Sequence, residues 1–404
     1  MSGVYGGSAI NIAATSAKDG TMGCFFKSAQ AFRMPRTLRG ESRFWDFALD
    51  NHFDTLLCEP LLRRAWVFQE RFLAPRTLHF TNSQIFWECR EGRRCGLFPT
   101  RVLQDLVYWS GFPKSIPRRG DSASWQNIVE IYSAGMLTNA TDRLVAISGV
   151  ARWLQAHYED DYLAGIWRKD MERQLCWYVR KRDYDHLITS IPRSKFYLAP
   201  SWSWASILNG VQFMQTESSY WCTQKLLIRV LDAHTILENE EYKFGKATGG
   251  ALRLAVRYLL YGVECPPSPE EESGDIANST GDTILDYYRV VWDCPGDPSP
   301  KKKLYLLPVN STCDDRANQP YGNHRPGIDG WEPNLEKNKK PAICNIDGII
   351  LEATEASKRA EYRRVGSWTS GNVKDLEEKS DDSDESLYEE VEENGTKLRV
   401  ITII

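Results

Sequence analysis

The sequence predicts an α+β fold in three successive parts: a mixed α/β portion at the N-terminus, a helical middle, and an antiparallel, β-rich C-terminal half. Between residues 63 and 73, and again between 125 and 179, apolar residues recur at spacings of three and four, as on one face of a helix. From Ser201 onwards they alternate at a spacing of two, as in strands with one buried face. No repeat of fixed period occurs, so a solenoid or propeller has no support.

The N-terminal part is predicted to hold a short buried strand, a helix and a hairpin. An apolar run at residues 10–15 predicts the strand, and residues 63–73 predict the helix, which Pro75 ends. Two β-prone runs at 77–80 and 85–89, joined by four polar residues, predict the hairpin. The residues expected on one face of the helix are Trp66, Gln69, Glu70 and Leu73.

Three helices are predicted in the middle of the chain. The first is expected to share one face among Trp125, Ile128, Val129, Tyr132 and Met136. The second opens at Thr141 and Asp142 and is expected to align Leu144, Ile147, Ala151 and Leu154. The third is expected from about Asp161 to Val179.

The C-terminal half is predicted to be antiparallel β structure. Trp202 and Trp204 are expected on one face of a strand that follows Pro200. Further strands are expected at 225–232, 251–263, 284–293, 303–309, 344–353, 361–368 and 397–404. The segments predicted to be disordered insertions are 265–281, 310–341 and 370–396. The resulting domain boundaries are 1–100, 120–182 and 196–404.

Composition excludes several classes of protein. The 404 residues carry a formal net charge of -4, and 370–396 alone hold 11 acidic and 2 basic residues. The remainder is only weakly basic, so we expect no nucleic-acid binding, which requires concentrated positive charge. The abundance of tryptophan and tyrosine, 14 and 18 residues, favours interaction surfaces.

Cysteine spacing and the N-terminus predict a cytoplasmic location. The ten cysteines form no CxxC pair, and Cys89 and Cys95 lack a second pair at the spacing of a zinc site. The first 17 residues lack the basic start and the apolar length of a signal peptide or membrane span. We therefore expect reduced thiols, no metal and no membrane span.

Several blocks together resemble the fungal heterokaryon incompatibility (HET) domain. Residues 12–19 (IAATSAKD) and 23–26 (GCFF) are similar to the middle of that domain, and residues 64–71 (RAWVFQER) and 86–89 (FWEC) to the signature that closes it. Blocks similar to stretches that follow the domain are 125–133, 142–149, 162–167 and 200–206. The signature residues are Arg64, Trp66, Gln69, Glu70, Leu73, Arg76, Phe80, Trp87, Cys89, Trp202 and Trp204.

The resemblance implies a role in fungal self/non-self recognition linked to programmed cell death, through other proteins that include an allelic or non-allelic incompatibility partner. It also implies that residues 1–100 are the C-terminal part of a TIR-like α/β domain. The family's front portion has no counterpart here, so we expect the chain to begin within the domain and to leave a sheet edge unpaired.

Glu70 is the only candidate catalytic residue. Its carboxylate lies among Arg63, Arg64, Arg71 and Arg76 in the sequence, and TIR-like relatives that hydrolyse NAD use a glutamate to stabilise the ribosyl cation. The alternative function is thus an NAD glycohydrolase, with NAD as the one cofactor considered, and a third is a fragment without activity. The structural alternative, which we favour, is that Glu70 pairs with one of those arginines and orients the helix against the hairpin.

Three further side chains have both a chemical and a structural reading. His79 is either a general base or a polar strand residue, and Cys89 is either a reactive thiol or a small core residue. Trp202 and Trp204 form either a ligand platform or part of the core. No phosphate loop, dinucleotide fingerprint or HExxH motif occurs, so no cofactor is predicted outside the NAD reading.

Overall fold

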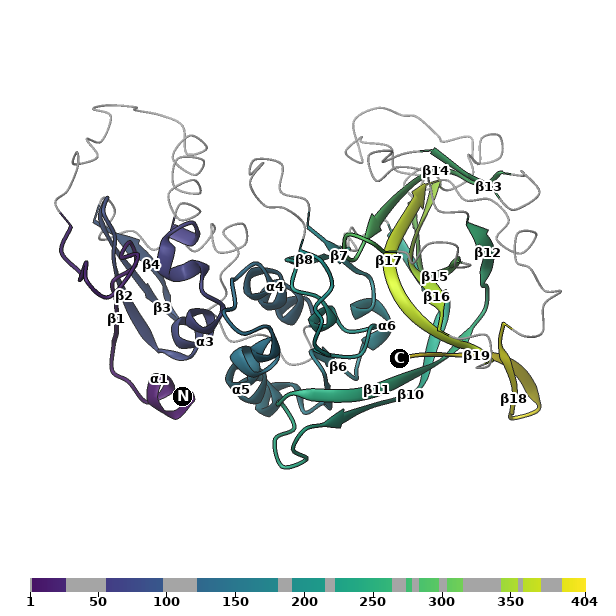
Figure 1. The fold of residues 1–404 in the computed structure, drawn as a ribbon, viewed down its shortest axis with the longest axis horizontal. Coiled ribbons are helices and arrows are strands. Elements are labelled where there is room, and N and C mark those ends of the chain that lie inside the picture. Colours follow the sequence, from purple (N-terminus) through teal and green to yellow (C-terminus); the bar gives the residue numbers. More distant parts are fainter. Residues whose placement is uncertain are drawn as a thin grey trace, which may run out of the picture.

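A computed structural model shows a mixed α+β molecule with few helices and a strand-rich C-terminal half, as the sequence predicts. Figure 1 shows a small sheet, a helical middle and a large curved sheet in a row, with the N-terminus beside the small sheet and the C-terminus beside the large one. The structure describes residues 2–26, 56–96, 122–180, 191–214, 222–263, 274–277, 283–297, 304–314, 343–354, 359–371 and 387–404.

The small sheet has four strands in the order β1-β2-β3-β4. A short helix α1 (Ser2–Gly6) precedes it, and its strands are β1 (Asn11–Ala13), β2 (Arg76–Phe80), β3 (Ile85–Cys89) and β4 (Gly92–Cys95). β2 and β3 form the predicted hairpin, whereas β1 runs parallel to β2. The expected burial of the first strand is wrong in part, because Ile12 is 61% exposed on the edge strand.

The predicted helix before the hairpin is confirmed as α3 (Ala65–Leu73), preceded by a 3-10 turn (Pro60–Arg63). It ends before Pro75, as expected. Burial extends beyond the predicted face of Trp66, Gln69, Glu70 and Leu73, because the helix lies between the small sheet and the helical middle. Its buried residues are Ala65, Val67, Phe68, Gln69, Arg71, Phe72 and Leu73.

The helical middle contains α4 (Ser122–Ser133) and α5 (Ser148–Tyr158). The expected face of the first helix is fully buried, except that Met136 lies beyond its end and is 62% exposed. The second helix begins later than predicted, because two 3-10 turns, Ala140–Asp142 and Val145–Ile147, precede it. Asn139 caps the first of these turns by accepting from the Thr141 amide, which favours a turn over a continuing helix.

The prediction of a third helix is wrong. Its residues form β5 (Tyr162–Leu163), β6 (Ile166–Trp167), α6 (Met171–Gln174) and β7 (Trp177–Val179), the last paired with β8 (Val211–Phe213). Ala164, Gly165 and Asp170 all have positive φ, which an α-helix does not tolerate. Ala164 and Gly165 instead join β5 and β6 in a two-residue hairpin turn.

The predicted strand through the two tryptophans is also wrong. Trp202 lies in a turn and Trp204 begins a 3-10 helix (Trp204–Ser206). The hydroxyl of Ser203 accepts a hydrogen bond from the Ala205 amide at 3.0 Å, which stabilises the turn over an extended strand. Both indole side chains are fully buried in the core.

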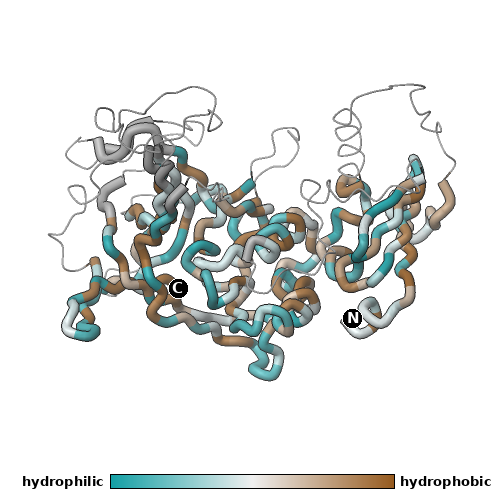
Figure 2. Tube along the Cα trace, turned by 180° about the vertical axis from the view of Figure 1, so that it is seen from behind, coloured by the Kyte–Doolittle hydropathy of each residue, from teal (hydrophilic) through white to brown (hydrophobic). Residues whose placement is uncertain are grey.

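The large sheet contains the predicted C-terminal strands in the order β10-β11-β19-β17-β16-β15-β12, antiparallel apart from a short parallel pairing of β17 with β19. Teal and brown segments alternate along its long strands (Figure 2). The strands are β9 (Cys222–Leu226), β10 (Ile228–Leu237), β11 (Ala247–Val256), β12 (Leu260–Val263), β13 (Gly274–Ala277), β14 (Thr283–Trp292), β15 (Leu304–Asp314), β16 (Ile343–Ala353), β17 (Glu361–Gly371), β18 (Glu389–Glu393) and β19 (Thr396–Ile403).

Parts of the predicted insertions are ordered strand. β13 falls within 265–281, the end of β15 within 310–341, and β18 within 370–396. The acidic β18 pairs with β19 and forms an exposed ion pair between Glu389 and Arg253, so cross-strand contacts offset its self-repulsion. Within 370–396 the end of β17, the buried Leu387 and Tyr388, and residues 394–396 are also described, and the rest of the three insertions lies outside the described residues.

One apolar core joins the helical middle to the large sheet. It contains buried residues of α3, α4 and α5 together with residues of β10, β11, β15, β16, β17 and β19. The buried apolar residues of the small sheet, Ala13, Phe86 and Cys95, lie outside this core. No helix within the described ranges is long and apolar enough to cross a membrane.

Candidate functional site

Two signature residues on α3 attach the helix to the helical middle. The Gln69 side-chain oxygen accepts a hydrogen bond from the Gly149 amide at 2.5 Å, at the start of α5. The Trp66 indole donates to the carboxylate of Asp142 at 3.3 Å. Leu73 packs into the same core with 4% exposure. The block at 64–73 therefore contacts the block at 142–149.

The Gly165 carbonyl is the meeting point of three other blocks. It accepts hydrogen bonds from the indoles of Trp125 at 2.9 Å and Trp204 at 2.7 Å. The Ser203 hydroxyl donates to the neighbouring carbonyl of Ala164. Gly165 has a φ of +100°, and an added Cβ would lie 2.7 Å from the Trp204 indole nitrogen. A glycine is required here for both reasons.

Arg143 is a buried cation that the same blocks enclose. Its guanidinium donates to the backbone carbonyls of Ser133 at 3.1 Å and Asn209 at 2.9 Å, and it lies 5.4 Å from the ring centre of Trp204. Burial lowers the pKa of Arg143 to about 10. Carbonyl dipoles and an aromatic face thus stabilise this charge.

The small sheet is built around the buried carboxylate of Glu88. Arg71 of α3 forms two hydrogen bonds to it, His79 Nε2 lies 3.1 Å from Oε2, and Arg93 Nε lies 3.4 Å from Oε1. On its other side, the His79 ring lies 3.0 Å from the Thr15 hydroxyl. All five side chains are buried, so the arrangement binds α3, β2, β3 and β4 to one another.

The charge state of Glu88 follows from its partners. Burial alone would raise the pKa of this carboxyl, but the charge of Arg71 and the hydrogen bonds from His79 and Arg71 outweigh it. The pKa of Glu88 therefore lies well below its usual range. The carboxylate that pairs with an arginine of α3 is thus Glu88, which the sequence did not single out.

Glu70, the candidate catalytic residue, lies on the side of α3 that faces α1. It is partly buried and accepts a hydrogen bond from the Tyr5 hydroxyl. Burial, this hydrogen bond and the charge of Glu70 raise the pKa of Tyr5 to about 12. In the part of the chain that the structure describes, Glu70 belongs to none of the ion pairs around Glu88.

The remaining signature residues lie on or beside the small sheet. Arg64 is exposed at the start of α3, and Phe80 is partly buried with its ring 6.0 Å from that of Phe25. Arg76, Trp87 and Cys89 line a pocket of about 380 Å³ on the outer face of the hairpin. The other lining residues are Pro75, Arg90, Glu91, Gly92 and Arg94. His79 is on the opposite, buried face, and the structure does not bring it together with Glu70 or Cys89.

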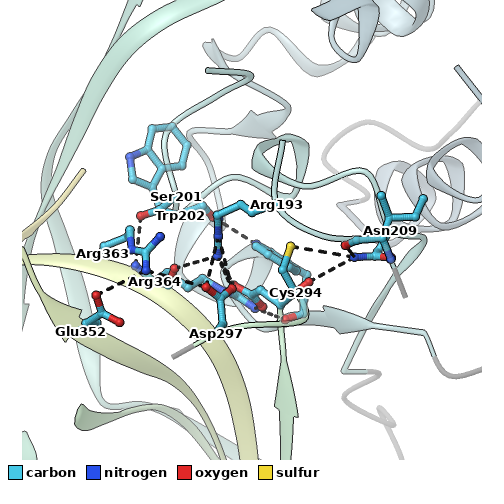
Figure 3. A network of polar contacts seen from close by, with 12 residues as sticks. Arg193, Ser201, Trp202, Asn209, Cys294, Asp297, Glu352, Arg363 and Arg364 are labelled. Atoms are coloured by element: carbon cyan, nitrogen blue, oxygen red, sulfur yellow. Dashed lines mark hydrogen bonds and ion pairs between the residues drawn. The ribbon is translucent and has the colours of Figure 1, made fainter. Parts of the chain in front are cut away.

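A second polar network joins the helical middle to the large sheet (Figure 3). The fully buried Arg364 of β17 pairs with Asp293 through Nε at 3.2 Å and stacks 3.3 Å above the ring of Trp177. It also donates to the Leu175 carbonyl at 2.6 Å. Beside it, Arg193 donates to Asp297 at 2.8 Å.

Sequence reasoning missed Glu88 and Arg364, for different reasons. Glu88 occupies the same strand face as Phe86, so the alternation of the hairpin already places a carboxylate on the buried side. A carboxylate on the buried face of a strand needs a buried cationic partner, and in the structure this partner is Arg71. Arg364 and Asp293 lie 71 positions apart, and nothing local to either residue indicates the other.

Comparisons with known proteins identify no relative: no protein-family model, no curated protein and no solved structure matches this chain. Within the described ranges, no group of three or more histidine, cysteine or acidic side chains is placed to hold a metal ion.

Proposed function

We propose that this protein is a cytoplasmic recognition protein of the fungal heterokaryon incompatibility class, linked to programmed cell death and acting mainly through other proteins. The supporting observation is that the blocks which carry the resemblance contact one another. Gln69 binds Gly149, and Trp125 and Trp204 meet at Gly165. Blocks from separate parts of the sequence thus belong to one packed unit, as expected of one inherited module.

The small sheet and α3 are proposed to be the C-terminal part of a TIR-like domain. β1 and β2 are parallel, and α3 lies between them in the sequence. A helix that connects two parallel strands is the building unit of α/β domains.

The alternative is an NAD glycohydrolase that uses Glu70. One observation favours keeping it: the Glu70 carboxylate is only partly buried, so it is not confined within the ion cluster of the small sheet. The two functions differ in whether Glu70 is needed.

Inducible expression in a filamentous fungus separates them. We expect hyphal death, scored by vital-dye uptake, with wild-type protein and equally with Glu70→Gln, while cellular NAD stays constant. Glu241→Gln, at an exposed turn of the large sheet, is the matched control. Loss of NAD and of killing in Glu70→Gln alone would establish the enzyme instead. Full viability with abundant, folded wild-type protein would refute the proposal.

A further inference from the structure

The two faces of the β2–β4 ribbon are chemically different. The strand register places Arg76 opposite Cys89, and Trp87 opposite Arg94, all on the outer face. The intervening residues, Glu88 and Arg93 among them, point to the buried face. The outer face therefore presents two cross-strand pairs that each combine a guanidinium with a neutral side chain.

The arginines next to the inner face form ion pairs with Glu88, and those of the outer face do not. Arg71 and Arg93 both pair with Glu88. Within the described residues, no ion pair is formed by Arg76 or Arg94, and both are exposed. Among the described residues, the hydrogen-bond partner of Arg76 is the Ala9 carbonyl, at the long distance of 3.5 Å.

These outer arginines line a concave site, not a flat surface. The pocket of about 380 Å³ falls within the range of sites that hold small organic ligands. Arg90 contributes a third guanidinium, positioned 4.9 Å from the ring centre of Trp153, while Glu91 is the one acidic lining residue. Among the described lining residues, Arg76 and Arg94 are two guanidinium groups outside any ion pair, against the single carboxylate of Glu91, so this part of the lining carries excess positive charge.

Two features of the pocket favour a flat ring beside the anion. Trp87 is partly buried, lies between Leu78 on β2 and Arg94 on β4 in the register, and lines the pocket. Gly92 pairs with Cys89 and has no side chain to fill the space beside that thiol. Aromatic side chains stack on planar rings such as nucleobases, and one guanidinium group can donate two parallel hydrogen bonds to a phosphate.

We propose that this pocket binds a small organic phosphate that carries a planar ring, of the size of a mononucleotide. Arg76 and Arg94 bind the phosphate, and Trp87 stacks on the ring. This site is separate from Glu70, whose neighbour is Tyr5, so the inference holds whether or not the proposed function is correct.

Calorimetric titration of the full chain with AMP, adenosine and inorganic phosphate tests this. We expect AMP to bind more tightly than either fragment, because each fragment lacks one of the two contacts. Arg76→Gln and Arg94→Gln should each weaken AMP binding about tenfold or more, the effect of losing one charged hydrogen bond. Trp87→Leu should reduce AMP affinity to that of phosphate. Arg152→Gln, exposed on α5 outside the pocket, is the matched control and should change nothing.

A thiol footprint locates the bound ligand. Cys89 lines the pocket and Cys58 is an exposed free cysteine elsewhere, so AMP should slow alkylation of Cys89 and leave Cys58 unaffected. Absence of AMP binding at millimolar concentration would overturn the proposal. So would binding that Arg76→Gln and Arg94→Gln both leave unchanged, or phosphate binding as tightly as AMP.

Discussion

The small sheet and the junction between the helical middle and the large sheet are stabilised by different means. The small sheet buries few apolar side chains, and its interior is the ion cluster around Glu88. The junction is filled by large indoles, among them Trp125, Trp177 and Trp204, with the Arg364–Asp293 pair set within them. Buried ion pairs recover much of their desolvation cost, whereas buried aromatics add net stability. We therefore expect the small sheet to be the less stable of the two regions.

The largest expected effect comes from the junction. Arg364→Met leaves Asp293 buried without its main cationic partner and removes the stacking on Trp177. We expect the free energy of unfolding, measured with denaturant, to fall by about 3–5 kcal/mol. Arg253→Met removes an exposed pair on the same sheet and should cost less than about 1 kcal/mol. Equal losses in the two variants would contradict the account.

The second effect should be confined to the small sheet. Glu88→Gln removes the buried negative charge that Arg71, His79 and Arg93 contact, while keeping a similar side-chain volume. We expect a loss of about 3 kcal/mol that hydrogen exchange detects in residues 76–95 and not in 343–371. Glu390→Gln, at an exposed position, serves as the control. Faster exchange across both segments would show that the two regions unfold together.

A smaller effect tests the link between the regions. Gln69→Ala removes the acceptor for the buried Gly149 amide, and leaving a buried donor unsatisfied costs about 1–3 kcal/mol. We expect this loss in thermal unfolding of the whole chain, because α3 belongs to the main core. Gln155→Ala, whose side chain makes a longer contact of 3.4 Å to Asp160, should have less effect. A larger loss from Gln155→Ala would place the link elsewhere.

The smallest expected effect is a loss of stability on acidification that is confined to the small sheet. The pKa of Glu88 is lowered in the folded state from an ordinary value of 4.5, so its stabilising contribution is complete above pH 4.5. That contribution decreases as the pH falls towards the folded value, by about 1 kcal/mol between pH 7 and pH 4. Hydrogen exchange in residues 76–95 should show this decrease in the wild type and not in Glu88→Gln. The same slope in both proteins would assign it to another group.

The sequence predicts elements wherever local pattern dominates. The hairpin at 77–89, the face of Trp125 and Tyr132, and most C-terminal strands follow from periodicity, because one buried side decides each of them. The segment 161–179 was mispredicted because its apolar spacing suits a helix while Gly165 requires a turn. The hydrogen bonds from Trp125 and Trp204 to the Gly165 carbonyl stabilise the turn, and the spacing of apolar residues does not predict these tertiary contacts.

The candidate site was predicted only in part. The helix that carries Gln69 and Glu70 is where the sequence placed it, yet the ionic partner of α3 is Glu88. The alternation of buried and exposed residues predicts that Glu88 lies on the buried face of the hairpin. Which of the nearby arginines pair with it depends on the tertiary structure. The pocket beside Cys89 depends on the register of three strands, which the sequence predicted for only two.

Native-state hydrogen exchange at low denaturant concentrations tests the central claim, that α3 joins two regions of unequal stability. Amides of β2 and β3 should exchange through an opening of lower free energy and weaker denaturant dependence than those of α4 and β16. One shared free energy and one shared denaturant dependence for all four elements would contradict it.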